Sequence, residues 1–208
     1  MKKYYKNLKL LEKNYVYSKE MEHDACGVGL IASTEGKKSR QVVKYGIEAL
    51  KAVWHRGAVD ADGKTGDGAG IHVEIPKDFF IEKVEVTGHT YDNCEICVGM
   101  IFLPRNDYDA QESCKTIVES ELTKNNFNIF GWRQVPVNPK VLGVKAFQTM
   151  PEIIQVLFKS NDQNLLNKKL ERKIYETRRK IENKALNLSL NNFYICSLSS
   201  KSIIYKGM

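Results

Sequence analysis

The feature that most constrains the fold is an abrupt change of residue character at Cys26. Residues 1–25 are polar and rich in lysine, and their few apolar residues follow no clear period. From Cys26 to Ser33 the chain is instead a run of small and apolar residues, CGVGLIAS, which is typical of a buried strand. The sequence therefore predicts an unstructured leader over residues 1–25 and a globular domain over residues 26–208.

Composition places the 208-residue chain among ordinary globular proteins, because 42% of its residues are hydrophobic and 27% are charged. No run approaches the roughly 18 apolar residues needed to cross a membrane. The N-terminal residues also lack the apolar centre of a secretory signal. Five cysteines, an odd number, do not fit a disulfide framework. We therefore expect a reduced, cytoplasmic protein with no membrane partner.

The net charge of +7 raises the question of a nucleic-acid partner. The basic residues gather in the first 20 positions and in residues 168–184, where glutamates are interspersed among them. Apolar residues recur there at helical spacing, namely Leu166, Leu170, Ile174 and Ile181. This pattern predicts the solvated face of an amphipathic helix. No recognisable nucleic-acid-binding motif accompanies it, so we expect no nucleic-acid partner.

The remaining patterns alternate between helix and strand. Helices are expected over residues 39–57, 107–125 and 168–184. Strands are expected over residues 26–33, 71–76, 97–104, 127–137 and 153–160, followed by a closing hairpin of residues 193–200 and 202–207. Residues 59–70 and 137–151 are expected to be loops. The order predicts an α+β domain in which sheets and helices form layers.

Cys26 is the sharpest candidate for chemistry, because it stands where the leader meets the first predicted strand. A thiol nucleophile needs a proton acceptor, and no histidine lies at an obvious partner spacing. Cutting the bond between Ala25 and Cys26 would supply one, since a free α-amine has a pKa of about 7.7–8.0 and can take the thiol proton. The alternative is that Cys26 is a small buried residue at the start of a strand.

Three other motifs invite a functional interpretation. The glycine loop TGDGAG at 65–70 resembles a phosphate cradle, but it follows a helix and precedes a strand, so a tight turn is the better prediction. Cys94 and Cys97 form a C-x-x-C motif without a second pair, which favours core positions over a zinc site. Trp132 and Arg133 either line a pocket or serve packing. We expect no metal site.

Several segments together resemble a known family. They are HDACGVGLIA, VWHRGAVDADGKTGDGAG, GWRQVPVNPKVLG, ERKIYETRRKIE and FYICSLSSKSIIYKGM. In order and spacing they resemble the N-terminal glutaminase domain of glutamate synthase large subunits, from about Glu22 to Met208. The CGVG start, the HRG triplet and the loop D-x-x-x-G-D-G-A-G are also similar to class II glutamine amidotransferases in general.

The resemblance implies an N-terminal-nucleophile hydrolase fold, an αββα sandwich of two antiparallel sheets between helix layers. It implies that Cys26 becomes the first residue after removal of residues 1–25. Its thiolate would attack the side-chain amide of L-glutamine, releasing ammonia and leaving a γ-glutamyl thioester for water to hydrolyse. Gly27 would keep the backbone close beside the nucleophile, Arg56 would brace the site, and Asp67 would order the pocket wall.

The resemblance also implies partners outside this chain. Ammonia would pass to a flavin domain that converts 2-oxoglutarate to glutamate, and FMN and an iron–sulfur cluster would bind in downstream synthase domains, with a small subunit as a further partner. No cofactor is expected in this segment itself.

The family's glutamine clamp and oxyanion segments, which resemble R-F-S-T-N-T and H-N-G-E-I-N, are not found in residues 1–208. We therefore expect a partial domain that is inactive and poorly soluble by itself. The alternative is a non-catalytic association module that keeps the fold and never exposes Cys26 as an N-terminus.

Overall fold

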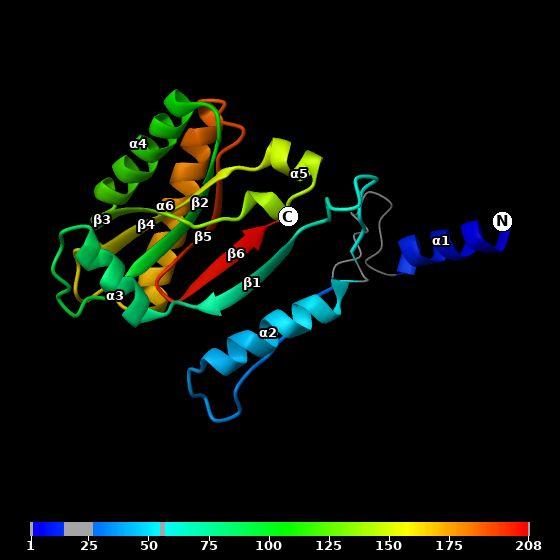
Figure 1. Cartoon of the computed structure of the whole chain (residues 1–208), viewed down its shortest axis with the longest axis horizontal. Coiled ribbons are helices and arrows are strands. Elements are labelled where there is room, and N and C mark those ends of the chain that lie inside the picture. The colour runs from blue at the N-terminus through cyan, green and yellow to red at the C-terminus, as the bar shows by residue number, and fades with distance from the viewer. Residues whose placement is uncertain (1, 15–26, 55–56, 208) are drawn as a thin grey trace.

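Two antiparallel sheets stacked against each other form the centre of the computed structural model, which describes residues 2–14, 27–54 and 57–207 (Figure 1). The larger sheet has the strand order β3-β4-β2-β5. Its strands are β2 (Cys97–Leu103), β3 (Phe127–Gln134), β4 (Glu152–Ser160) and β5 (Tyr194–Ser199). The smaller sheet pairs β1 (Ala69–Glu74) with β6 (Ser202–Gly207). The expected α+β class is thus confirmed.

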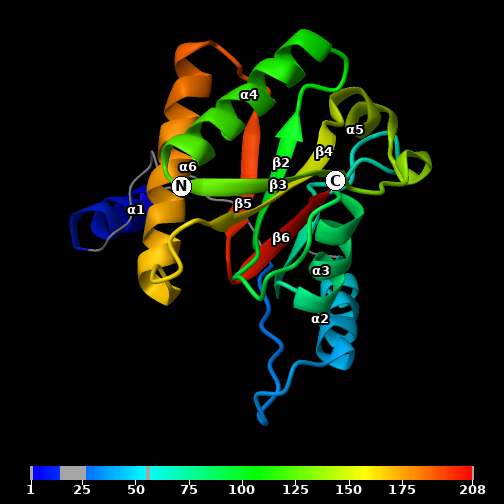
Figure 2. The same ribbon diagram turned by 90° about the vertical axis from the view of Figure 1, so that its left-hand side faces the viewer.

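Helices cover the outer faces of this pair of sheets (Figures 1 and 2). The helices α4 (Tyr108–Lys124) and α6 (Asn167–Asn187) lie on the larger sheet, and α2 (Arg40–Ala52) lies against β1. The layer order is therefore helix, sheet, sheet, helix. A further helix, α3 (Lys77–Val86), contacts β3, and α1 (Lys2–Asn14) precedes the layers. No helix in residues 2–14, 27–54 or 57–207 is long and apolar enough to span a membrane.

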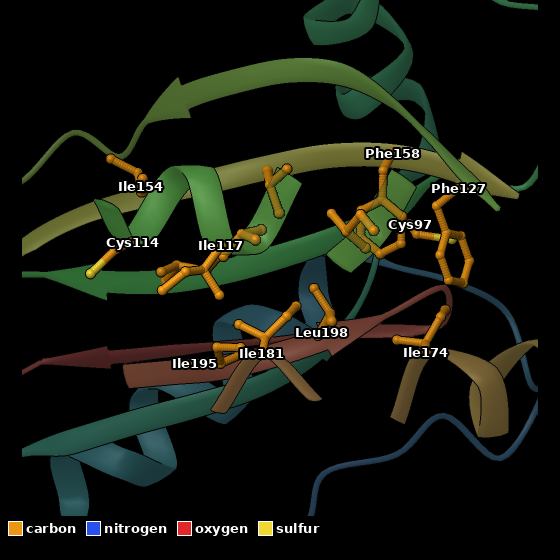
Figure 3. Packing of buried hydrophobic residues seen from close by; sticks show 14 of the residues in the cluster. Cys97, Cys114, Ile117, Phe127, Ile154, Phe158, Ile174, Ile181, Ile195 and Leu198 are labelled. Carbon is orange, nitrogen blue, oxygen red and sulfur yellow. The ribbon is translucent and has the colours of Figure 1, made fainter. Parts of the chain in front are cut away.

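The first core lies between the larger sheet and helices α4 and α6 (Figure 3). Alternate residues of β4 point toward the helices, and Val156 and Phe158 are fully buried there. The ring of Phe158 meets that of Phe127 edge to face, with centroids 5.3 Å apart. Ile174 and Ile181 supply the apolar stripe of α6, as the spacing of its sequence predicts. These contacts bind both helices to the sheet.

The second core fills the space between the two sheets and contains α3, a helix that we did not expect from the sequence. Phe80 and Val84, four residues apart on α3, are fully buried beside Val98 and Met100 of β2. Pro76 forms the N-cap of this helix. Proline at a helix start and an i, i+4 apolar pair were the available signals.

The predicted strand at residues 26–33 is wrong over the part that the structure describes. Residues 27–33 form no strand, and the side chains of Val28 and Leu30 are 95% and 88% exposed. An apolar run becomes a strand only where another strand satisfies its backbone groups. No strand in the described part of the chain pairs with this run. Cys26 itself lies outside the described residues.

The predicted closing hairpin is also wrong, because β5 and β6 belong to different sheets. Glu171 of α6 holds the connection between them. Its carboxylate accepts hydrogen bonds from the hydroxyls of Ser199 and Ser200 at 2.9 and 2.8 Å and from the Ser200 amide at 2.7 Å. This clamp lets the chain turn out of the larger sheet, so β6 pairs with β1 instead.

The helix expected near residues 39–57 is confirmed in its start and shorter at its end. Ser39 caps α2, since its hydroxyl accepts a hydrogen bond from the Gln41 amide at 3.0 Å. The helix ends at Ala52, so Trp54 lies beyond it and is 74% exposed.

Two segments expected to be irregular contain helices. Residues 137–151 include the 3₁₀ turn η2 (Pro139–Val141) and the short helix α5 (Val144–Thr149). The leader includes α1 over Lys2–Asn14, so it is not unstructured throughout. Helices α1 and α5 both have exposed apolar residues, among them Leu10 and Phe147.

Candidate active site

Four residues were predicted to form the site, and the structure describes two of them, Gly27 and Asp67. Cys26 and Arg56 lie outside the described residues. Gly27 lies against Val53, because a Cβ at Gly27 would stand 3.8 Å from Val53 Cγ2. Val53 is the C-cap of α2, three residues before Arg56. The structure therefore brings together the segments that adjoin Cys26 and Arg56 in sequence.

Asp67 closes the base of a hairpin formed by residues 57–67. Its Oδ2 accepts a hydrogen bond from the Ala58 amide at 2.7 Å. Val59 and Gly66 form the next bridge, and the Asp60 amide donates to the Thr65 carbonyl at 2.8 Å. Asp67 thus holds the backbone at Ala58, two residues after Arg56 in sequence.

The glycine loop at 65–70 has one position with positive φ, Gly68, as expected of a turn, and a tight turn around Gly63 directly precedes it. Gly63 and Gly68 have φ values of +67° and +91°, which a residue with a side chain rarely adopts. The segment leads from the hairpin straight into β1. No helix N-terminus follows it, so the geometry of a nucleotide loop is absent from this part of the described chain.

Asp62 organises the tip of the hairpin, and sequence reasoning did not single it out. Its Oδ1 accepts from the Lys64 and Thr65 amides at 2.9 and 2.7 Å, and its Oδ2 accepts from the Thr65 hydroxyl at 2.5 Å. Oδ2 also accepts from the Val144 amide of α5 at 3.0 Å. An Asp followed by Gly and Thr signals a local turn, but the bond to Val144 spans 82 residues and leaves no local signal.

These hydrogen bonds hold the pKa of Asp62 well below its usual range, first because the Thr65 hydroxyl donates to the carboxylate and then because backbone amides do. The group is therefore ionised at any pH at which the fold is studied. Asp62 is suited to holding the hairpin and unsuited to donating a proton.

The described cysteines are poor nucleophiles. Burial raises the pKa of Cys97 well above its usual value and, as the main cause in each case, that of Cys114 to about 11 and that of Cys94 to about 12. Cys196 is also buried, and its pKa is raised for the same reason. Only the thiolate attacks, so these four thiols lack the property that catalysis requires.

The same cysteines do not fit a metal or an iron–sulfur cluster. Cys94 and Cys97 belong to different cores, and within residues 2–14, 27–54 and 57–207 no three His, Cys, Asp or Glu side chains gather as a metal site would require. The prediction that Cys97 and Cys196 are core residues is confirmed.

Trp132 and Arg133 serve both of the roles considered for them. They contribute to the wall of a cavity of about 400 Å³ between α4 and the larger sheet, which no residue of the 57–67 hairpin lines. The Trp132 indole donates to Glu119 Oε1 at 2.6 Å. The Arg133 guanidinium donates to the buried Gln155 Oε1 at 2.7 Å and stands over the Phe79 ring.

Comparison with known proteins gives this geometry a context. The family model "Glutamine amidotransferases class-II" matches residues 26–208. The chain is 55% identical over 192 residues to the glutamate synthase [NADPH] large chain of Azospirillum brasilense, which covers 92% of this chain and 13% of that protein. It is 40% identical over 205 residues to the ferredoxin-dependent glutamate synthase of Pyropia yezoensis, covering 96% of this chain and 13% of that protein.

A third relative is the ferredoxin-dependent glutamate synthase 1 of Arabidopsis thaliana, which is 40% identical over 189 residues, covering 90% of this chain and 12% of that protein. The chain therefore spans about an eighth of the length of these relatives. The family match begins at Cys26, the residue at which the sequence changes character. The two stacked antiparallel sheets, the helix layers and this match together show that the chain belongs to the class II glutamine amidotransferases and has their N-terminal-nucleophile hydrolase fold.

Proposed function

We propose that this chain is the glutaminase part of a glutamate synthase, hydrolysing L-glutamine through a thioester on Cys26 and supplying ammonia for glutamate formation from 2-oxoglutarate. The observation that carries the proposal is the contact of Gly27 with Val53, which draws together the segments that adjoin Cys26 and Arg56. The family match over residues 26–208 and the 55% identity to a glutamate synthase large chain support it.

The chemistry begins with removal of residues 1–25. The new α-amine of Cys26, whose pKa is about 7.7–8.0, accepts the thiol proton. The thiolate attacks the glutamine Cδ, and the protonated amine returns the proton to the leaving nitrogen, so that ammonia departs and a γ-glutamyl thioester remains. Water, activated by the same amine, then adds to the thioester and releases glutamate and the thiol.

The remaining site residues position the groups of the site and take no part in bond making or breaking. Gly27 keeps the backbone close beside the nucleophile, and it lies next to Val53 at the end of α2. Arg56 braces the site, and Asp67 orders the wall next to it through the Ala58 amide. The four described cysteines take no part, since burial keeps their thiols protonated.

The electron chemistry belongs to other regions of the polypeptide. FMN and an iron–sulfur cluster would bind in downstream synthase domains, with a small subunit as a further partner, in the cytoplasm. The described residues of this chain do not fit a cluster. We also propose that residues 1–208 alone are inactive and poorly soluble, and the exposed side chains of Val28, Leu30 and Ile31 support the low solubility.

The rival function is a non-catalytic association module. Two measurements on the full-length polypeptide separate the two functions. The mass of the N-terminal peptide shows whether the chain begins at Cys26 or at Met1. Reaction with 6-diazo-5-oxo-L-norleucine, an electrophilic glutamine analogue, then identifies the nucleophile.

The enzyme predicts a chain that starts at Cys26, stoichiometric labelling of that residue, and loss of both labelling and glutaminase activity in Cys26→Ala. Cys94→Ser is the matched control, because Cys94 is half-buried and remote from the 57–67 hairpin, and it should keep full activity. Retention of residues 1–25 together with ammonia release would refute the mechanism, and retention without any activity would favour the module.

A further inference from the structure

The segment GWRQVPVNPKVLG has no task in the proposed reaction, yet its last residue lies against the hairpin that follows Arg56. Gly143 packs so closely there that a Cβ on it would overlap Thr65 Oγ1 and Asp62 Oδ2 and would stand 2.6 Å from the Thr65 amide nitrogen. Only glycine allows this approach. The two segments are therefore in close contact across a separation of about 80 residues.

Asp62 makes a hydrogen bond to the backbone at this contact, and an ion pair between Lys145 of α5 and Asp60 lies beside it. Its Oδ1 accepts only from its own hairpin, from the Lys64 and Thr65 amides. Its Oδ2 reaches across to the amide of Val144, the first residue of α5, at 3.0 Å. Both oxygens thus accept hydrogen bonds from the tip of the hairpin, and Oδ2 also ties that tip to α5.

The tip is coupled to the base of the hairpin by a short ladder. The Asp60 amide bonds to the Thr65 carbonyl at 2.8 Å, Val59 pairs with Gly66, and the Ala58 amide bonds to Asp67 at 2.7 Å. These hydrogen bonds connect the tip of the hairpin to its base at Ala58 and Asp67.

We propose that Asp62 is a positioning residue for glutamine recognition: by joining the hairpin tip to α5, it sets the position of the hairpin base and of Asp67 within it. The inference rests on the proposed glutaminase function. Asp62 contacts no reacting atom in the proposed reaction. Its replacement should therefore weaken substrate binding and leave the reactivity of the Cys26 thiol unchanged.

The test is Asp62→Asn in the full-length polypeptide. The amide retains an oxygen for the Lys64 and Thr65 amides, so the turn is kept, but it places an NH₂ group against the Val144 amide and removes the bond across the contact. We expect the KM for glutamine to rise about tenfold while kcat changes less than about threefold. Thermal unfolding is measured alongside.

Gly143→Ala disturbs the same contact from the opposite side, since its methyl group enters the space occupied by Asp62 and Thr65. It should raise KM in the same way. Lys64→Ala is the matched control, because its side chain is exposed on the same hairpin and its backbone amide is unchanged. Its KM should stay within about twofold of the wild type.

Two reagents separate positioning from general damage. Iodoacetamide reports the reactivity of the Cys26 thiol and needs no pocket wall, so its rate should be unchanged in Asp62→Asn. The glutamine analogue 6-diazo-5-oxo-L-norleucine needs the wall, so its rate should fall about tenfold, in parallel with the rise in KM. This split is a result that a merely structural role would not produce.

A KM within threefold of the wild type in Asp62→Asn overturns the proposal, whatever the unfolding temperature. Equal slowing by both reagents overturns it too, as does loss of the fold in both Asp62→Asn and Gly143→Ala. Should one variant fail to fold, the other decides. Failure of the proposed function is seen separately, as full activity in Cys26→Ala.

Discussion

Glu121 of α4 accepts a hydrogen bond from the ammonium of Lys184 on α6, and this ion pair joins the two helices that cover the larger sheet. The side chain of Glu121 is 6% exposed, whereas that of Lys184 is 43% exposed. The hydrogen bond is the main reason that the pKa of Glu121 is lowered and that of Lys184 is raised. A nearly buried carboxylate is therefore stabilised mainly by one partly exposed partner, with Lys124 at 3.7 Å as a second.

Replacing Glu121 with Gln should lower the thermal unfolding temperature by a few degrees at pH 7, because the amide carries no charge to stabilise Lys184. Glu112→Gln is the control, since Glu112 forms an exposed pair with Lys115 on the same helix and should have almost no effect. Circular dichroism melts would measure both. An unchanged melting temperature in Glu121→Gln would contradict the prediction.

The same pair predicts a pH dependence. The pKa of Glu121 is depressed in the folded protein, so its contribution is complete above the unfolded value of about 4.3 and is lost as the pH falls through the lower folded value. The difference in melting temperature between wild type and Glu121→Gln should therefore persist from pH 7 to about 5 and shrink below about 4. A difference that grows on acidification would show that the pair is not stabilising.

Gly99→Ala tests the packing of the larger sheet at its centre. A Cβ at Gly99 would stand 2.6 Å from both Leu198 Cδ1 and Val156 Cγ1, the side chains of the two neighbouring strands. Overpacking of this kind costs about 1–3 kcal/mol of folding free energy. Gly207→Ala, where nothing lies within 4 Å, is the control. Denaturant unfolding should separate the two variants, and equal midpoints would disprove the close packing.

The raised pKa values of the buried thiols predict selective labelling. With pKa values of about 11 for Cys114 and about 12 for Cys94, the thiolate fraction of each at pH 8 is about 10⁻³ or less. Cys97 and Cys196 are also held in the protonated form. Limited iodoacetamide at pH 8 should therefore label Cys26 at least about 100-fold faster than any of the four. Peptide mass spectrometry measures the labelling rate of each cysteine. Labelling of Cys94 at a rate similar to that of Cys26 would contradict the prediction.

Asp67→Ala should lower kcat/KM for glutamine by about tenfold, because the Ala58 amide beside Arg56 loses its acceptor. Asp67→Asn keeps an oxygen at the same place and should restore most of the activity. This comparison separates the hydrogen bond from the negative charge. Equal losses in both variants would show that the charge of Asp67, not its hold on Ala58, is what the site needs.

Much of the fold could be predicted from local pattern. The short apolar run of β4 predicts a buried strand, and the apolar spacing of α6 predicts a helix with one buried face. The Ser39 cap of α2 was readable for a similar reason, since its hydrogen bond reaches only two residues along the chain.

The candidate site was predictable only in part. Cys26 and the glycine loop stand out by residue type and order, and resemblance supplied the roles of Gly27, Arg56 and Asp67. Asp62 and Gly143 were missed. An aspartate in a turn and a glycine before a helix are common local features, and neither one indicates whether the two residues are in contact. The strand expected at residues 26–33 was wrong for a related reason. An apolar run indicates a possible strand, but it does not show whether a neighbouring strand is available to pair with it.

The amino-acid sequence by itself determined where most helices and strands lie and singled out Cys26 as the candidate nucleophile, because both depend on local periodicity and on the chemistry of single side chains. Only the tertiary structure decided that β5 and β6 enter different sheets and that Asp62 reaches Val144 across 82 residues. Those outcomes depend on backbone groups finding partners far along the chain, and a hydrogen bond between distant residues leaves no trace in the pattern of either one.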